Sequence, residues 1–333
     1  MRLFAICVLI LSAAARGVAQ GRPPIIDMHL HAHRLADYGG GMPVCANDQR
    51  ITFHGMDPRE PITPRTYSRL KSCAAPLRAS ASDEANQRET LALLERYNIV
   101  AVTTGSLERV RAWRAAAPHR IIPAHAFGEA DSLGVEELRR LVASRDLAVF
   151  AEVSPQYAGL PLDDPRFEPY FALAEELDVP VGVHLGEGSY GGPYGASPRY
   201  RARLTSPFQL EDVLVRHPRL RLWVMHYASP LVDEMIAVMY AHPQVYVDIA
   251  GNDWQYPRAH FYAQLRKLID AGLGKRIMWG SDSMVWPRAL EVAVETVANA
   301  PFLTAGQKRD IFHDNAARFL RLAAGGTAPR ARR

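Results

Sequence analysis

Beyond its N-terminal segment, the sequence lacks any apolar run long enough to cross a membrane, which takes about 20 residues. It also lacks an excess of basic charge over its main part. The net charge of +4 arises from arginines at the two ends of the chain, so no nucleic-acid surface is predicted. No internal repeat or low-complexity stretch precedes Ala324. The hydrophobic fraction of 48% is ample for one large core.

The N-terminal segment has the organisation of an export signal. Arg2 gives a positive start, residues 3–15 are apolar, and Gly17-Val18-Ala19 offers small residues for cleavage. We therefore expect a signal peptide over residues 1–19 and a periplasmic or secreted protein. A retained anchor helix is the alternative, which the shortness of the apolar run disfavours.

Two of the three cysteines, Cys45 and Cys73, remain once the signal is removed. They lie in one segment, and an oxidising compartment favours a disulfide between them. Such a bond would stabilise the fold by roughly 3 kcal/mol in the chain-entropy account. Two unpaired thiols are the alternative.

Eight β-branched runs alternate with helical patterns along the chain. The runs begin near residues 24, 99, 120, 147, 179, 220, 245 and 276, and the helices follow near 84–97, 107–117, 135–144, 165–177, 207–216, 231–240, 259–271 and 288–298. Strict alternation predicts an α/β fold, a (β/α)8 TIM barrel over residues 20–325, with a disordered basic tail over 326–333. A doubly wound open sheet is the alternative, but no Gly-rich phosphate loop follows the first strand.

The connection between the first strand and its helix is unusually long. Residues 33–82 contain three consecutive glycines, several prolines and both remaining cysteines, without a clear helical period. In a barrel such a connection rises over the C-terminal ends of the strands, where the chemistry of this fold takes place. We therefore expect it to form a lid over the active site.

The run Asp27-Met28-His29-Leu30-His31 ends the first predicted strand. Side chains alternate along a strand, so His29 and His31 point the same way. At a strand end in a barrel, that direction is the mouth. Two imidazoles there can chelate zinc or a similar divalent metal.

Other polar residues also stand at the C-terminal ends of predicted strands, where barrel side chains converge. A single strand-end histidine is often an ordinary hydrogen-bonded core residue. This ordinary explanation would have to hold independently for each residue of the set, so a shared functional site explains the set better. The set comprises Glu152, His184, His226 and Asp282.

These motifs resemble the amidohydrolase superfamily, in its amidohydrolase-related (amidohydrolase 2) branch, which includes the aminocarboxymuconate semialdehyde decarboxylase-like proteins. The resemblance extends from Ile25 to about Leu322. It rests on Asp-x-His-x-His at residues 27–31, on His184 and His226 at the ends of the fifth and sixth predicted strands, and on Gly-Ser-Asp at residues 280–282. The segment after Asp282 reads Ser-Met-Val-Trp-Pro, where family members often have an aromatic residue and a proline.

The resemblance implies a bound divalent metal, zinc first, with manganese or iron as alternatives. His29, His31, His184 and Asp282 would be ligands. Glu152 would either bridge two ions or face the substrate as a free carboxylate, so the number of ions, one or two, stays open. A metal of this kind lowers the pKa of water toward neutrality.

The resemblance also implies the reaction. Asp282 would accept a proton from water and pass it to the leaving group, while His226 would polarise the substrate or bind a second ion. We expect hydrolysis of a C–N or C–O bond in an amide or lactone. The alternatives are non-oxidative decarboxylation of an unsaturated or aromatic acid, and a barrel that binds a metabolite without turnover.

The expected partner is a small carbonyl or carboxylate compound rather than a nucleic acid. The oligomeric state is left open, with a homodimer among the options. Four residues in the loops after the fifth, seventh and eighth predicted strands are candidate substrate contacts, namely Tyr190, Arg199, Trp254 and Trp286.

Overall fold

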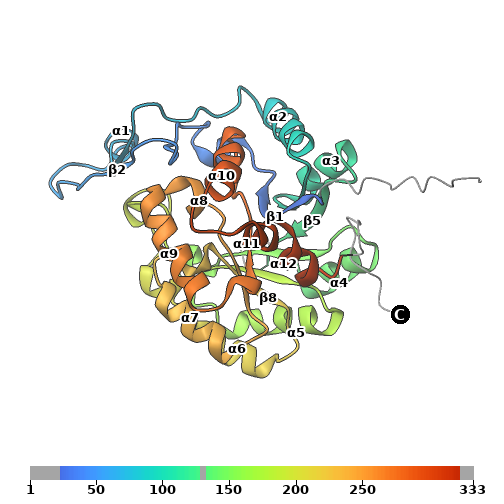
Figure 1. The fold of residues 1–333 in the computed structure, drawn as a ribbon. Helices are drawn as coiled ribbons and strands as arrows, with labels where there is room; N and C mark the ends of the chain where they lie inside the picture. The colour runs from blue at the N-terminus through green and yellow to red at the C-terminus, as the bar shows by residue number, and fades with distance from the viewer. Residues whose placement is uncertain (1–22, 128–132, 323–333) are drawn as a thin grey trace, which may run out of the picture.

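The structure is a computed structural model that describes residues 23–127 and 133–322 (Figure 1). The predicted signal peptide and basic tail lie outside the described residues, so both stay predictions. No helix in the described part is long and apolar enough to cross a membrane.

Eight parallel strands form one sheet in chain order, each paired with the next. The backbone N–H of Met28 donates to Trp279 O at 3.0 Å, which joins the first strand to the last. The predicted TIM barrel is thereby confirmed. The strands are β1 (Ile25–His31), β4 (Ile99–Thr104), β5 (Ile121–His125), β6 (Val149–Val153), β7 (Val181–His184), β8 (Leu222–Met225), β9 (Tyr246–Asp248) and β10 (Ile277–Met278).

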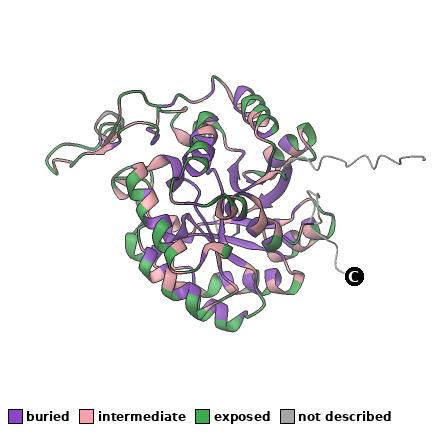
Figure 2. Cartoon of the chain, in the orientation of Figure 1, coloured by how far each residue is buried: buried purple, intermediate pink, exposed green. Residues whose placement is uncertain are grey.

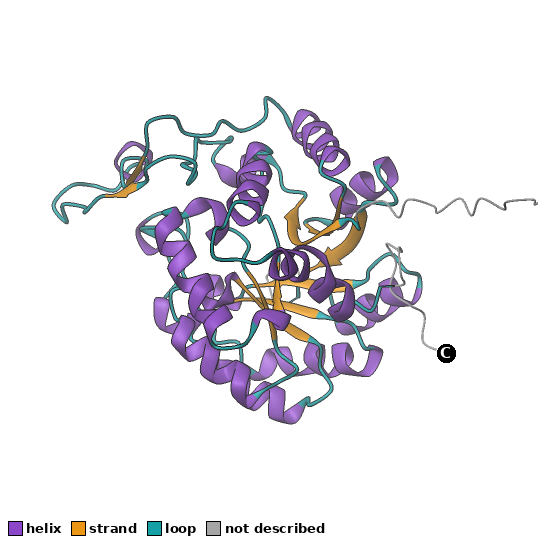
Figure 3. Cartoon of the chain, in the orientation of Figure 1, coloured by secondary structure: helices purple, strands orange, loops and turns teal. Residues whose placement is uncertain are grey.

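The helices form a ring outside the strands, with buried faces toward the sheet and exposed faces outward (Figures 2 and 3). All eight predicted helices are present. They are α2 (Asp83–Arg96), α3 (Leu107–Ala116), α4 (Val135–Ala143), α5 (Glu168–Leu177), α6 (Leu210–Arg216), α7 (Val232–Ala241), α9 (Arg258–Asp270) and α10 (Arg288–Ala298). Shorter helices are α1 (Pro64–Tyr67), α8 (Asn252–Gln255), α11 (Ala305–Arg309) and α12 (Asn315–Phe319).

Short 3-10 turns complete the ring, and two of them replace the first turn of a predicted helix. Before α5 and α6, the side chains of Asp164 and Ser206 accept hydrogen bonds from backbone N–H groups two residues on, and this tightens the entry. Ser82 accepts from Ala85 N at 3.1 Å and begins α2, as the sequence predicts.

Two shifts in strand register determine which side chains face the mouth of the barrel. In β1 the register shifts between Asp27 and Leu30, and in β6 between Phe150 and Val153. Met28 packs in an inner cluster with side chains from other strands, whereas Leu30 packs in the cluster beneath the helices. The inward face of β1 therefore changes within the shift, just where the two histidines stand.

The carboxylate of Asp27 holds the closure of the barrel together. Its Oδ1 accepts from the backbone N–H groups of His29 and Ser281, both at 2.9 Å, and the side chain is fully buried. Burial raises the pKa of Asp27 to about 7, against the opposing effect of these hydrogen bonds. Asp27 thus links β1 to the segment after β10 that carries Asp282.

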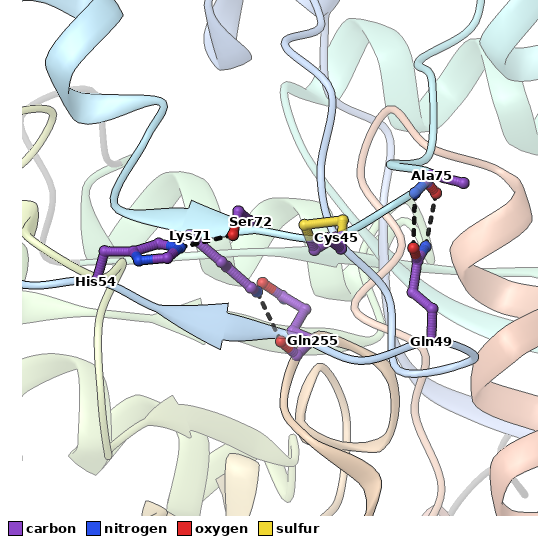
Figure 4. The surroundings of a disulfide bond; sticks show 8 residues. Cys45, Gln49, His54, Lys71, Ser72, Ala75 and Gln255 are labelled. Carbon is purple, nitrogen blue, oxygen red and sulfur yellow. Dashed lines mark hydrogen bonds between the residues drawn. A yellow bond between two sulfur atoms is a disulfide. The ribbon is translucent and has the colours of Figure 1, made fainter.

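The lid, residues 33–82, lies over one side of the barrel and projects beyond it at α1 and β2 (Figure 1). It contains an antiparallel pair, β2 (Thr52–Phe53) and β3 (Lys71–Ser72), too short for the sequence to reveal. The structure forms the predicted disulfide between Cys45 and Cys73 (Figure 4). Gln49 adds two hydrogen bonds to the backbone of Ala75, at 2.6 and 2.7 Å.

Lys71 attaches the lid to the barrel. Its Nζ donates to Gln255 O at 2.6 Å and lies 5.5 Å from the ring centroid of Phe53 and 5.6 Å from that of Tyr256. Among the described residues it has no ion pair. Burial lowers the pKa of the Lys71 ammonium to about 8, because the charged form loses water without gaining a carboxylate.

We expect Asp27→Ala to lower the free energy of unfolding by about 3 kcal/mol, since two buried N–H groups lose their acceptor. Asp27→Asn should cost much less, because it keeps an oxygen for both. Urea unfolding of the metal-free protein measures the difference. Equal losses in the two variants would contradict the role of this acceptor.

Lys71 should also give the stability a distinct pH dependence. The folded pKa of about 8 lies below the ordinary 10.5, so the unfolded chain binds more protons between these values. Below pH 8, folding carries the full free-energy cost of burying the Lys71 ammonium. This cost falls as the pH rises from 8 toward 10.5, because the folded protein releases the proton. Wild type should therefore gain free energy of unfolding relative to Lys71→Met between pH 7.5 and 9.5. A constant difference would contradict the shift.

Candidate metal centre and active site

Glu152 lies at the centre of the site, among histidines from three strands. Its Oε2 is 3.3 Å from His29 Nε2 and 3.4 Å from His31 Nε2. Its Oε1 contacts His184 Nδ1 and lies 3.8 Å from His226 Nε2. One carboxylate thus faces four imidazoles at the mouth of the barrel.

Asp282 and His226 complete the group that the sequence predicts. Asp282 Oδ1 is 3.0 Å from His31 Nε2 and 3.7 Å from His29 Nε2. His226 Nε2 is 3.2 Å from His184 Nδ1. All six strand-end residues proposed from the sequence therefore converge on one buried centre.

The imidazole nitrogens and carboxylate oxygens of this centre suit a divalent metal ion. One group, with ligand atoms within 4.8 Å of one another, comprises His29, His31 and Glu152, and a second comprises Glu152, His184 and His226. Imidazole nitrogens with carboxylate oxygens suit zinc, manganese or iron. The nitrogens of His184 and His226 also face each other closely, an arrangement that a shared cation between them would favour. A third group comprises His29, His226 and Asp248. Glu152 is the carboxylate common to the first two groups, and its two oxygens could bind separate ions.

The electrostatics of the centre follow from burial and close opposite charges. Burial raises the pKa of Glu152, but His29 and His184 more than offset it, so this pKa lies well below its ordinary value. Burial lowers the pKa of His29, yet Glu152 and Asp282 raise it well above its ordinary value. The metal-free centre therefore pairs a carboxylate with an imidazolium, and a metal ion would replace the positive charge.

Asp248, at the end of β9, is a site residue that the sequence reasoning missed. Its Oδ1 accepts from the backbone N–H groups of His226 and Ala250, at 2.9 and 3.1 Å. Its Oδ2 accepts from Trp223 Nε1 at 3.0 Å and lies 3.5 Å from His29 Nδ1. A carboxylate behind a ligand histidine fixes its tautomer and ring orientation. The strand-end rule that selected His184 applies equally to Asp248 and would have found it.

Other side chains around the mouth come from loops, in which no periodic sequence pattern predicts their position. Tyr157 Oη is 3.4 Å from His184 Nε2. The ring of His33 stacks on that of His31, with centroids 4.5 Å apart. The ring of Tyr38 lies edge-on to that of His33, with centroids 5.5 Å apart. Burial raises the pKa of Tyr38 well above its ordinary value, and the charges of Asp282 and Glu152 raise it further.

The four candidate substrate contacts lie in different surroundings. Trp254 is fully buried, with Nε1 donating to Ser281 O at 2.7 Å, so it supports the segment before Asp282. Trp286 donates to Met42 O at 3.0 Å and lies against Tyr38. Tyr190 donates to His54 O in the lid at 3.0 Å, whereas Arg199 is exposed. Trp286 and Tyr190 thus join the lid to the mouth.

We expect Asp248→Asn to weaken zinc binding about 10- to 100-fold, because in either orientation an amide nitrogen would face N–H donors, those of Trp223 on one side or those of His226 and Ala250 on the other. Competition with a chromophoric chelator measures the affinity. Asp233→Asn, at an exposed residue paired with Lys267, is the matched control. Unchanged affinity in Asp248→Asn would contradict the supporting role.

Solved structures with the same fold include several barrel proteins. An uncharacterised TIM-barrel protein from Bordetella bronchiseptica is 19% identical, with a TM-score of 0.59, over 89% of this chain and 98% of that one. A 5-carboxyvanillate decarboxylase from Sphingomonas paucimobilis is 16% identical, with a TM-score of 0.54, over 91% and 100%. A probable 2-pyrone-4,6-dicarboxylic acid hydrolase from Acinetobacter baumannii is 14% identical, with a TM-score of 0.57, over 89% and 98%.

At these identities, the structural likeness establishes the fold and leaves the reaction open. No curated protein matches the chain. The family model described as amidohydrolase matches residues 26–322, which include every residue of the centre. The chain therefore belongs to the amidohydrolase family and is an enzyme of that family.

Proposed function

We propose that this enzyme is a metal-dependent hydrolase that cleaves the C–N or C–O bond of a small amide or lactone. The observation that carries the proposal is the position of Glu152, shared by two groups of histidines, with Asp282 beside them. This arrangement suits activation of water better than simple binding of a metabolite, because a carboxylate base stands next to the ligands.

His29, His31, His184, Glu152 and Asp282 would hold the metal, with zinc favoured by the nitrogen-rich set and manganese or iron as alternatives. Glu152, which both groups of histidines share, would bridge the ions where two are bound. When bound, a metal here would lower the pKa of water and polarise a carbonyl oxygen.

Asp282 is the proposed base. One carboxylate oxygen faces His31, and the other accepts a hydrogen bond from Gln255 Nε2 at 3.2 Å. Both oxygens are thus held, and the carboxylate is oriented to take a proton from water and return it to the leaving group.

His226 is oriented by its other ring nitrogen. Nδ1 donates to Ala250 O at 2.8 Å, so Nε2 faces the centre. With the proton on Nδ1, Nε2 of the neutral imidazole would act as a ligand to a second ion, whereas the imidazolium form would donate from Nε2 to the substrate carbonyl. His226 is buried, and beside the mouth Trp286 contacts Tyr38 and Met42 of the lid.

We also propose that the protein is exported. Residues 1–19 have the organisation of a signal peptide, and the Cys45–Cys73 disulfide suits an oxidising compartment. Two observations from separate parts of the chain therefore support the same location.

Zinc-loaded enzyme should hydrolyse members of a panel of lactones and amides, such as dihydrocoumarin, and lose this activity on chelation. Asp282→Asn should lower kcat by about 10³-fold, because it removes the base. Asp212→Asn, at an exposed position, is the control. Release of carbon dioxide from aromatic acids, without hydrolysis of the panel, would instead establish the decarboxylase alternative.

A further inference from the structure

Gln255 joins the lid to the proposed base through two separate groups. Its side-chain Nε2 donates to Asp282 Oδ2 at 3.2 Å, and its backbone oxygen accepts from Lys71 Nζ at 2.6 Å. Figure 4 shows Lys71 extending from β3 to Gln255, near the disulfide. One residue thus contacts both the lid and the carboxylate on which the proposed chemistry depends.

The local backbone explains why Gln255 can reach Asp282. The helix α8 follows Gly251, whose φ of +70° is favourable for glycine. A Cβ at this position would lie 2.7 Å from Asp282 Oδ2 and 3.3 Å from Gln255 Nε2. Gln255 N donates back to Gly251 O at 2.7 Å, which closes the turn. The bare backbone therefore lets the helix pass directly beside the carboxylate.

Lys71 is held on the other side of this connection. It lies two residues before Cys73, whose disulfide to Cys45 restrains the lid, and its Nζ lies near the rings of Phe53 and Tyr256. Its ammonium has a backbone carbonyl as partner and no carboxylate among the described residues. A charge-assisted hydrogen bond to Gln255 O is therefore its main polar interaction in the structure.

We propose that Gln255 is a positioning residue for Asp282, and that Lys71 makes this positioning depend on the lid. Gln255 holds one oxygen of Asp282, which keeps the other oxygen directed at His31. Lys71 fixes the backbone of Gln255 and thereby the reach of its amide. The inference rests on the proposed function, in which Asp282 is a metal ligand and base.

The test compares Gln255→Leu, Lys71→Met and the double variant with two matched controls away from the site, Gln87→Leu at a half-buried position and Lys267→Met at an exposed one. Gln255→Leu should lower zinc affinity and kcat for dihydrocoumarin about 10-fold each, with KM within about 2-fold. Lys71→Met should cost about 3-fold, and Lys71→Arg should recover most of that loss.

The double variant decides whether Lys71 acts through Gln255. If it does, the double variant should resemble Gln255→Leu alone; losses that multiply would overturn the coupling. Hydrogen exchange should rise at residues 252–256 in Lys71→Met and remain unchanged in Lys267→Met. If residues 252–256 stay protected from hydrogen exchange in both Lys71→Met and Lys267→Met, the coupling would also be overturned.

A loss in Lys71→Met confined to KM for anionic substrates would identify a substrate contact and overturn the positioning role. Zinc affinity and hydrogen exchange need no turnover. If wild type hydrolyses no member of the panel, the proposed function fails, and these two measurements still decide the roles of Gln255 and Lys71.

Discussion

The carboxylate of Glu152 is the group around which the site is arranged. In a buried centre of four imidazoles, any imidazole that is protonated needs a negative charge to compensate it. Glu152 provides that compensation for the metal-free protein, facing His29 and His31 with one oxygen and His184 with the other. The same position would let it bridge two cations. The register shift in β6 lies just where this side chain turns toward the mouth.

The sequence predicted the barrel and its six central residues because both depend on strong regularities. Alternating strands and helices can close in few ways, and strand ends in a barrel meet at one mouth. His29, His184 and Asp282 could therefore be placed together although they are far apart in the chain. Asp248, at the end of β9, obeys the same rule, but it lies outside the motifs that carry the family resemblance.

The lid could be predicted only as a long connection. Its strands are two residues each, its helix is one turn, and its attachments are individual hydrogen bonds of scattered residues such as Asn47, Lys71 and Tyr190. Such contacts leave no periodic pattern in the sequence. The same holds for Gln255, whose role depends on the backbone of Gly251 beside it. The disulfide was predictable, because two cysteines in one segment of a chain that is predicted to be exported have few other partners.

The hydrogen bonds that the Asp27 carboxylate accepts have a consequence for the order of folding. They join the first strand to the segment after the last, and the metal-binding groups of β1 meet Asp282 only when that junction forms. A growing or partly folded chain presents His29 and His31 early but lacks most of their companions. The contacts with the greatest separation along the chain must therefore form before the centre is complete, which ties metal capture to the final closure of the barrel.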